Sequence, residues 1–130
     1  MTSEHPHVAV ARQLIEAVEA GDLDALRELY LEDAVLWQNL SGQPVGREQA
    51  VKTVRWLRGA LQQLRYEDVR VAPTPDGFVQ QQTMVAVTAD GQPLRVDACL
   101  VATLRDGRIA RIDEYLDSGQ LAPLRAGRGS

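Results

Sequence analysis

Residues 76–117 read DGFVQQQTMVAVTADGQPLRVDACLVATLRDGRIARIDEYLD. Three Asp-Gly pairs, Asp76-Gly77, Asp90-Gly91 and Asp106-Gly107, interrupt this segment at intervals of fourteen and sixteen residues. Asp-Gly between alternating apolar residues is a strong signal for a β-hairpin turn. Three such turns imply four antiparallel strands, which we place near residues 65–72, 78–88, 94–105 and 108–117. Strands of this length must twist and curl, so the sheet has a concave face.

The N-terminal half has the apolar period of helices instead. Apolar residues recur at helical spacing over 8–20 and 23–30, and again from Arg47 to Leu64. Gly21 suits the end of the first helix and Asp22 the cap of the second, while 34–39 reads as a short strand. Helices followed by a long meander predict an α+β fold, in which a curved antiparallel sheet wraps on N-terminal helices as a cone around an apolar pocket.

Length, composition and charge limit the classes of protein. A chain of 130 residues with 45% hydrophobic and 25% charged residues has the size and composition of one globular domain. We expect a flexible N-terminus over 1–7, a single domain over 8–120 and a partly ordered tail over 121–130. The net charge of −4, with basic residues scattered among eighteen acidic ones, predicts no nucleic-acid partner. No apolar run is long enough for a membrane span and no signal layout is present, so we expect a cytoplasmic protein.

The sequence has no pattern typical of a metal or cofactor site. Cys99 is the only cysteine, so an internal disulfide or a cysteine-based zinc site within one chain is excluded, and we expect Cys99 to be an inert core residue. His5 and His7 precede the first helix in a segment expected to be mobile. The sequence contains no phosphate-binding glycine loop, HExxH motif or Gly-x-Ser-x-Gly motif. We therefore expect no metal and no cofactor.

Glu114 is the first candidate catalytic residue. Alternation along 108–117 places Ala110, Ile112, Glu114 and Leu116 on one side of the strand, and this side is the apolar one. A carboxyl group between aliphatic neighbours is costly to ionise, so its pKa should rise toward the range of a general base. Two alternatives remain open: the register turns Glu114 to solvent, or an arginine such as Arg111 pairs with it.

Trp37 and Asn39 are the second candidate pair, because they share one face of the strand at 34–39. An indole and an amide could together orient a substrate oxygen or a water molecule. The alternative is core packing for Trp37 and a turn-forming role for Asn39. On the strand near 94–105, Val96 and Ala98 belong to an apolar face, and the opposite face is also fairly apolar. A sheet with two such faces suggests a homodimer formed through the sheet.

Four segments carry a family resemblance: GDLDAL at 21–26, EDAV at 32–35, GREQA at 46–50, and DGRI with the following strand at 106–117. In this order and spacing they resemble the SnoaL-like branch of the nuclear-transport-factor-2-like superfamily over residues 8–120. This superfamily includes ketosteroid isomerases, polyketide cyclases, limonene epoxide hydrolases and non-catalytic binding or association domains. The resemblance implies a catalytic acid at Glu114, which strand alternation also selects.

The most similar local pattern is that of limonene epoxide hydrolase. Its Tyr-Gln-Asn resembles Trp37-Gln38-Asn39, which implies that Asn39 orients a water molecule. The arginine and aspartate that this family needs on a neighbouring strand are replaced here by Thr83 and Val85. Without that charged pair, push–pull opening of an epoxide is disfavoured. From the resemblance and the strand faces, the expected substrate-binding residues are Trp37, Thr83, Val85, Val96, Ala98, Ile112 and Leu116.

These observations predict an enzyme for a small hydrophobic molecule that works by general acid/base catalysis, as in polyketide cyclisation or ketosteroid isomerisation. Glu114 and Asn39 are the expected catalytic residues. Epoxide-hydrolase-like addition of water is one alternative. Another, from a different class, is a domain that binds a hydrophobic ligand or dimerises without catalysis.

Overall fold

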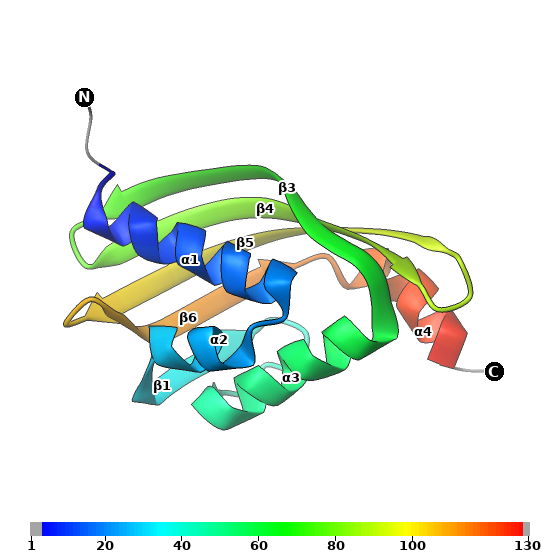
Figure 1. The fold of residues 1–130 in the computed structure, drawn as a ribbon, viewed down its shortest axis with the longest axis horizontal. Coiled ribbons are helices and arrows are strands. Elements are labelled where there is room, and N and C mark those ends of the chain that lie inside the picture. Colours follow the sequence, from blue (N-terminus) through cyan, green and yellow to red (C-terminus); the bar gives the residue numbers. More distant parts are fainter. Residues whose placement is uncertain (1–3, 129–130) are drawn as a thin grey trace.

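The protein consists of a helical layer packed on one face of a curved sheet, as its computed structural model shows (Figure 1). The structure describes residues 4–128, and side chains as far as residue 125. Helix α1 (Pro6–Ala20) ends at Gly21, whose φ of 68° is the left-handed conformation that glycine adopts readily. The Asp22 side chain accepts from the Ala25 N–H and so caps α2 (Leu23–Leu29). The third helix of this layer is α3 (Arg47–Ala60).

Four long strands form the predicted meander: β3 (Leu61–Thr74), β4 (Gly77–Thr88), β5 (Pro93–Arg105) and β6 (Arg108–Leu116). They pair antiparallel in sequence order, with turns at or beside the three Asp-Gly pairs. Strand β1 (Tyr30–Gln38) and the two-residue β2 (Val45–Gly46) complete a sheet of order β2-β1-β6-β5-β4-β3. Strand β6 pairs with β1 in parallel. The α+β prediction is confirmed, and β1 begins earlier than expected because Tyr30 belongs to it rather than to a helix.

The face of the sheet that the helices cover is called here the inner face, and the opposite face the outer face. On the inner face, apolar side chains from every long strand join those of α1, α2 and α3 in one core. Polar side chains also belong to this face, and Gln80 and Gln82 among them are buried. Residues that pair across the strands on the inner face include Leu36, Gln38, Phe78, Gln80, Gln82, Met84, Val96, Ala98, Leu100, Ala102, Ile112, Glu114 and Leu116.

One extra residue in β6 changes the alternation expected from the sequence. Arg111 pairs with Thr103 but Ile109 pairs with Leu104, so Ala110 is the inserted residue of a β-bulge. Ile109 is consequently fully buried, although strict alternation from Ile112 would place it on the opposite side of the strand. Beyond the bulge the predicted alternation holds, with Ile112 buried in the core.

The described residues near both ends of the chain form regular structure. His5 Nδ1 accepts from the His7 N–H and caps α1, and His7 Nδ1 donates to the Thr74 carbonyl oxygen at 3.1 Å. The segment 1–7 is therefore structured from His5 onward, while residues 1–3 lie outside the described residues. After β6 the chain forms a 3-10 turn, η1 (Ser118–Leu121), and helix α4 (Ala122–Arg128).

The C-terminal segment is fixed to the sheet by a pair of hydrogen bonds. The Gln120 side chain accepts from the Asp97 N–H at 2.7 Å and donates to Asp97 Oδ2 at 2.9 Å, while Leu121 and Leu124 pack against the core. The tail expected over 121–130 is thus helical as far as residue 128. Among the side chains described here two apolar ones, Leu121 and Leu124, pack on the core, which is too few to show a period in the sequence.

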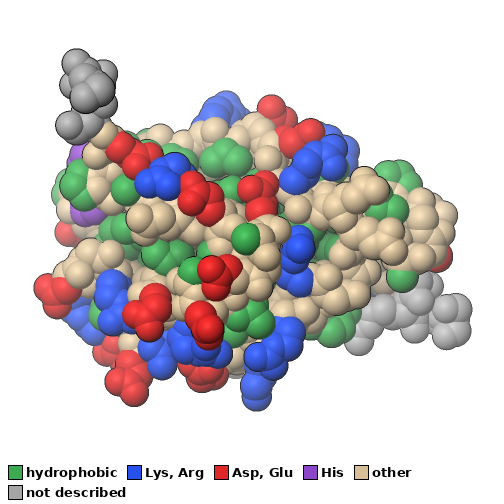
Figure 2. Space-filling model, in the orientation of Figure 1, with side chains coloured by type: hydrophobic (Ala, Val, Ile, Leu, Met, Phe, Trp, Pro, Cys, Tyr) green, Lys and Arg blue, Asp and Glu red, His purple; other side chains and the backbone are tan. Residues whose placement is uncertain are grey.

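Acidic and basic side chains are interspersed over the helical side of the molecule (Figure 2). Several form local ion pairs, such as Arg12 with Glu16 at 2.7 Å within α1 and Arg27 with Glu48 at 3.1 Å between α2 and α3. None of the helices in the described part of the chain has the length and apolar character needed to cross a bilayer.

Candidate active site

Glu114 lies on β6 directly beside Gln38 of the parallel strand β1. Gln38 Nε2 donates to Glu114 Oε1 at 2.5 Å. Within residues 4–128 no arginine or lysine forms an ion pair with Glu114, and Arg111 pairs instead with Asp113 at 3.0 Å. Both alternatives to a functional Glu114 are therefore absent: the side chain faces the helices and is not neutralised by a cation.

The environment of Glu114 favours its protonated form. Burial is the largest influence on the carboxyl group and raises its pKa above the ordinary value, while the hydrogen bond from Gln38 lowers the pKa and offsets part of this effect. Some of the Glu114 side chain nevertheless stays exposed. The carboxyl group itself is thus strongly desolvated.

Two tyrosines share the interior with Glu114. Tyr30 at the start of β1 is buried, and Tyr66 on β3 packs against the same core. Burial raises the pKa of both phenols, and the negative charge of Glu114 raises it further. Neither hydroxyl donates a hydrogen bond to another described residue. Both phenols therefore keep their protons and present neutral O–H donors near the carboxyl group.

A pair of amides lies on the same face, two strands away from Glu114. Gln80 Nε2 donates to Gln82 Oε1 at 2.5 Å, and both side chains are buried on β4. The inner face of β4 and β5 otherwise consists of apolar or small side chains. Among the described residues of this face, Glu114 is the ionisable group, and its neighbours are neutral amides, phenols and hydrocarbons.

The side chains of Trp37 and Asn39 belong to the outer face and not to the face of the Glu114 carboxyl group, although the Asn39 N–H donates to the Glu114 backbone carbonyl oxygen at 3.1 Å. Trp37 pairs with Asp113 across the strands and packs on Tyr115 of the outer face, with ring centroids 5.3 Å apart. The Asn39 amide donates to the Leu116 carbonyl and accepts from the Leu116 N–H, at 3.1 and 3.0 Å. Asn39 therefore extends the ladder between β1 and β6, which leaves its amide engaged by backbone. Gln38 takes the position near Glu114 that the sequence assigned to Asn39.

The predicted pocket residues divide between the two faces. Val96 and Ile112 are buried on the inner face, and Ala98 and Leu116 form a partly buried cross-strand pair there. Thr83 and Val85 alternate with Gln82 and Met84, so they belong to the outer face of β4. Thr83 Oγ1 donates to Asp97 Oδ1 at 2.7 Å. Thr83 and Val85 therefore do not share a face of the sheet with the Glu114 carboxyl group, and their predicted role in substrate binding stays a prediction.

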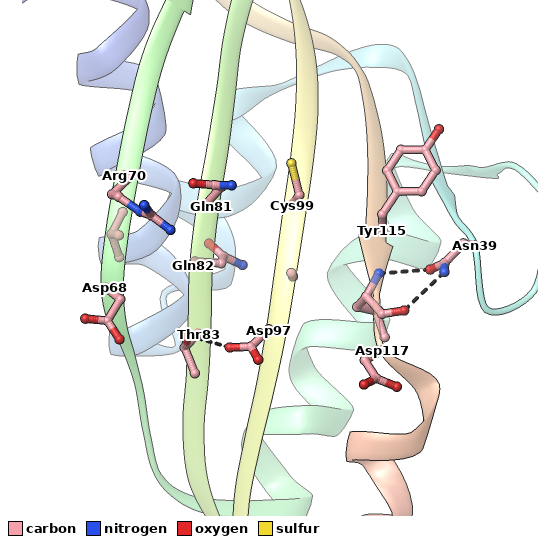
Figure 3. A pocket seen from close by; sticks show the side chains of 13 residues that line it. Asn39, Asp68, Arg70, Gln81, Gln82, Thr83, Asp97, Cys99, Tyr115 and Asp117 are labelled. Atoms are coloured by element: carbon pink, nitrogen blue, oxygen red, sulfur yellow. Dashed lines mark hydrogen bonds between the residues drawn. The ribbon is translucent and has the colours of Figure 1, made fainter.

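The outer face carries a hollow of about 950 Å³, lined by residues of β3, β4, β5 and the end of β6. Figure 3 shows Gln81, Cys99 and Tyr115 along it, with the helices behind the sheet. Cys99, which the sequence analysis placed in the core, is only half-buried here. Glu114 is not among the lining residues. Most of its lining residues belong to the outer face, although Gln82, Ala98 and Leu116 of the inner-face set also contribute.

A group of His, Cys, Asp and Glu side chains suited to hold a metal ion does not occur among the described residues. The carboxyl groups are dispersed, and Glu114 is surrounded by neutral groups. In this arrangement Glu114 can exchange a proton, and Tyr30 and Tyr66 can donate hydrogen bonds.

Sequence reasoning missed Gln38, Tyr30, Tyr66 and the buried Gln80 as members of the interior cluster. Gln38 could have been found only from the pairing of β1 with β6, which sets it against Glu114 over a separation of 76 residues. Tyr66 could have been recognised from the sequence, since alternation of apolar and polar residues begins there and aromatic side chains suit strands.

Residues 11–112 match the family model of the SnoaL-like domain, and the chain belongs to this family. The resemblance noted in the sequence is confirmed. No curated protein matches the chain significantly.

Solved structures share the fold at low sequence identity. A putative polyketide cyclase from Streptomyces antibioticus, IdmH, is 21% identical with a TM-score of 0.82, over 94% of this chain and 99% of that one. A putative isomerase from Bacillus subtilis is 18% identical with a TM-score of 0.80, over 94% of both chains. An epoxide hydrolase of the LEH-like type from M. tuberculosis is 19% identical with a TM-score of 0.69, over 92% of this chain and 88% of that one. At these identities the similarity concerns the fold.

Proposed function

We propose that the protein is an enzyme that removes a proton from a carbon atom next to a carbonyl group in a small, largely apolar molecule. Glu114 is the general base. The observation that carries this proposal is a carboxyl group with a raised pKa, held by one neutral amide and not by a cation. Aldol-type cyclisation and double-bond isomerisation both begin with this proton transfer.

The hydrogen bonding of Glu114 suits a base. Gln38 engages Oε1, and no hydrogen bond from the described residues reaches Oε2, so one oxygen is available to a substrate proton. A base works best when its pKa is close to the operating pH, and burial moves Glu114 in that direction. A positioned base of this kind contributes about 10²–10⁴-fold to the rate.

Tyr30 and Tyr66 are the donors proposed for the oxygen that becomes negative. Burial keeps both phenols protonated, so each can donate to an enolate oxygen in the water-poor interior. The proposed step transfers a proton from carbon to Glu114 and back, and it consumes no redox equivalent. It therefore requires no cofactor.

Addition of water to an epoxide is the less favoured alternative. Besides an acid, that reaction needs a charged pair to activate water and protonate the oxirane. The inner face of β4 carries the neutral amides Gln80 and Gln82, which cannot act as a charged pair. A domain that binds a hydrophobic ligand without reaction is the alternative of another class, and it differs from the proposed enzyme only in turnover.

The test is proton exchange at carbon. The protein is incubated in D2O with a panel of apolar ketones that includes 1-tetralone, and deuterium at the carbon next to the carbonyl is followed by NMR. We expect exchange above the buffer rate, and a decrease of at least about 10²-fold in Glu114→Gln. Glu67→Gln makes the same chemical change at an exposed glutamate on β3 and should keep the activity.

Thermal unfolding of both variants checks that they fold. If the folded Glu114→Gln variant exchanges as fast as the parent, Glu114 is not the base. Ligands that bind to the protein without any exchange would instead identify a binding module.

A further inference from the structure

Tyr66 points toward the helices because β3 is irregular. Leu61 pairs with Thr88 of β4. Tyr66 pairs with Met84, four residues earlier on that regular strand, so Leu61 and Tyr66 point to the same face. Tyr66 follows Leu61 by five residues, and strict alternation over this odd interval would turn it to the outer face. A one-residue β-bulge at 62–65 reverses the alternation and brings the phenol inside.

A second bulge follows directly after Tyr66. From Glu67 to Arg70 the strand again contains one residue more than β4 opposite it. The alternation is thereby reset, so that Val71, ten residues after Leu61, points inward as strict alternation requires. The two bulges together therefore turn only the piece of β3 between them, and Tyr66 lies within it. Bulges commonly re-aim a side chain in this way next to a functional site.

Each bulge contains a residue with a costly backbone conformation. Gln63 has a φ of 56° and Asp68 a φ of 53°, in the left-handed region that residues with a side chain seldom occupy. The third such non-glycine residue in the described part of the chain, Asp106, belongs to a hairpin turn. Conformations of this kind persist where the surrounding structure enforces them, and they are concentrated at functional sites.

The Glu19 carboxylate holds the same piece of β3 from α1, which packs along that strand (Figure 1). Its Oε2 accepts from the Tyr66 N–H at 2.8 Å, over a separation of 47 residues. Strand β3 is an edge of the sheet, and an N–H on the free side of an edge strand has no strand partner. A carboxylate acceptor makes a stronger bond there than a neutral one. Glu19 is half-buried and makes no other hydrogen bond or ion pair with a described residue.

We propose that Glu19 is a positioning residue, which together with the two bulges fixes the Tyr66 phenol in the direction from which it donates to the reacting oxygen. The catalytic consequence rests on the proposed function, because Tyr66 is one of the two donors assigned there to the enolate oxygen. Glu19 acts through the Tyr66 backbone and not by contact with the substrate. Misplacement of a catalytic group by about 1 Å can reduce a rate by about 10²-fold, so this tether can control the rate.

A double-mutant cycle separates positioning from mere attachment of α1 to the sheet. Glu19→Ala should lower deuterium exchange at least about tenfold, whereas Glu19→Gln, whose amide oxygen can still accept from the Tyr66 N–H, should stay within about threefold of the parent. In the Tyr66→Phe background Glu19→Ala should cause no further loss, because the hydroxyl that it positions is gone. Glu16→Ala, one turn earlier on α1 where Glu16 pairs with Arg12, is the control and should exchange as the parent does.

Two results of this cycle would overturn the proposal. One is an unchanged exchange rate in the folded Glu19→Ala variant. The other is an equal loss from Glu19→Ala in the parent and in the Tyr66→Phe background, which a purely structural role predicts. Thermal unfolding checks that the variants fold. If Glu19→Ala does not, Glu19→Asp serves in its place, because its carboxylate is one methylene shorter.

The phenol itself gives a readout that needs no turnover. With carbon-13 at Cζ of tyrosine, each of the three phenols gives one NMR signal, and single substitutions by phenylalanine assign them. We expect Glu19→Ala to shift the Tyr66 signal and to leave those of Tyr30 and Tyr115 in place, and Glu19→Gln to keep the parent signal. A Tyr66 signal that does not move in folded Glu19→Ala contradicts the positioning role.

The two proposals can fail separately. An absence of deuterium exchange in the parent would refute the proposed function, and the Tyr66 signal would still decide whether Glu19 positions the phenol. Exchange that depends on Glu114 but not on Glu19 would refute the positioning role alone.

Discussion

Gln38 of β1 and Glu114 of β6 are joined side chain to side chain at 2.5 Å, on neighbouring parallel strands. The amide is the group that lowers the pKa of Glu114, against the larger effect of burial. The pair therefore sets how strong a base Glu114 is at a given pH. It also explains why Glu114 can be buried without a cation.

Gln38→Leu should shift the pH dependence of activity. The substitution removes the hydrogen bond to the carboxylate, so the pKa of Glu114 rises further and the acid limb of the profile for exchange moves to higher pH. The measurement is the rate of deuterium incorporation against pH. Gln81→Leu on the outer face is the control. An unchanged profile in Gln38→Leu would show that the hydrogen bond does not tune the base.

Glu114→Gln should stabilise the protein at neutral pH. Since the folded pKa is raised, the folded state keeps a proton that the unfolded chain releases, so the parent loses stability as pH rises from the unfolded pKa to the folded one. Each unit of pKa shift corresponds to about 1.4 kcal/mol. Urea unfolding at pH 7 and at pH 4 checks this. We expect the advantage of the variant to shrink at the lower pH, and a variant less stable at pH 7 would contradict the burial of the carboxyl group.

Tyr30→Phe and Tyr66→Phe should lower activity more than stability. Neither hydroxyl bonds to a described residue, so its removal costs few folded-state contacts, whereas loss of one oxyanion donor reduces rates by about 10²–10³-fold. Exchange rates and melting temperatures are measured together. The third tyrosine supplies the control, because Tyr115 is 50% exposed on the outer face and Tyr115→Phe should behave as the parent. Full activity in both inner variants would remove the tyrosines from the mechanism.

Gly77→Ala should destabilise the sheet at the β4–β5 contact. A Cβ at this position would lie 1.9 Å from the Ala102 carbonyl oxygen, which is backbone and can move only with its strand. We expect a loss of at least about 1–3 kcal/mol in the free energy of unfolding. Gly59→Ala in α3 meets no atom within 4 Å and should instead gain about 0.5–1 kcal/mol. Comparable stabilities for the two variants would contradict the close approach.

A second copy of the chain is the partner we propose for the outer face. Val101, Val69 and Tyr115 are exposed there by 42%, 39% and 50%, on a sheet whose other face is already covered. Light scattering should report a dimer that Val101→Asp dissociates, while Val45→Asp on the edge strand β2 leaves it intact. A monomeric parent protein would exclude this role for the face.

The fold was largely predictable because its signals are local. The Asp-Gly pairs mark turns by backbone geometry alone: Asp106, Gly107 and Gly91 all have positive φ. The first helix was likewise readable from its apolar spacing and from Gly21. What could not be read is the bulge at Ala110, since the sequence alternates through it without interruption.

The site was predictable only in part, for a physical reason. Glu114 follows from alternation within one strand, because its neighbours Ile112 and Leu116 are unambiguously apolar. On β1 both faces are semi-apolar, with Val35 and Trp37 on one and Leu36 and Gln38 on the other. Which face of β1 turns toward the helices depends on its pairing with β6. Neither strand's sequence on its own indicates this contact between distant segments.

The position of β6 has a consequence for how the protein is made. Strand β6 is the last strand in sequence but lies between β1 and β5 in the sheet. During synthesis β1 therefore cannot pair with β6 until the final quarter of the chain has emerged. Contacts between such distant segments slow folding, because a long loop must close first. The carboxyl group and the amide that tunes it meet only at that closing step. A chain truncated before β6 therefore lacks the Glu114 base and leaves an unpaired strand edge open to association with other chains.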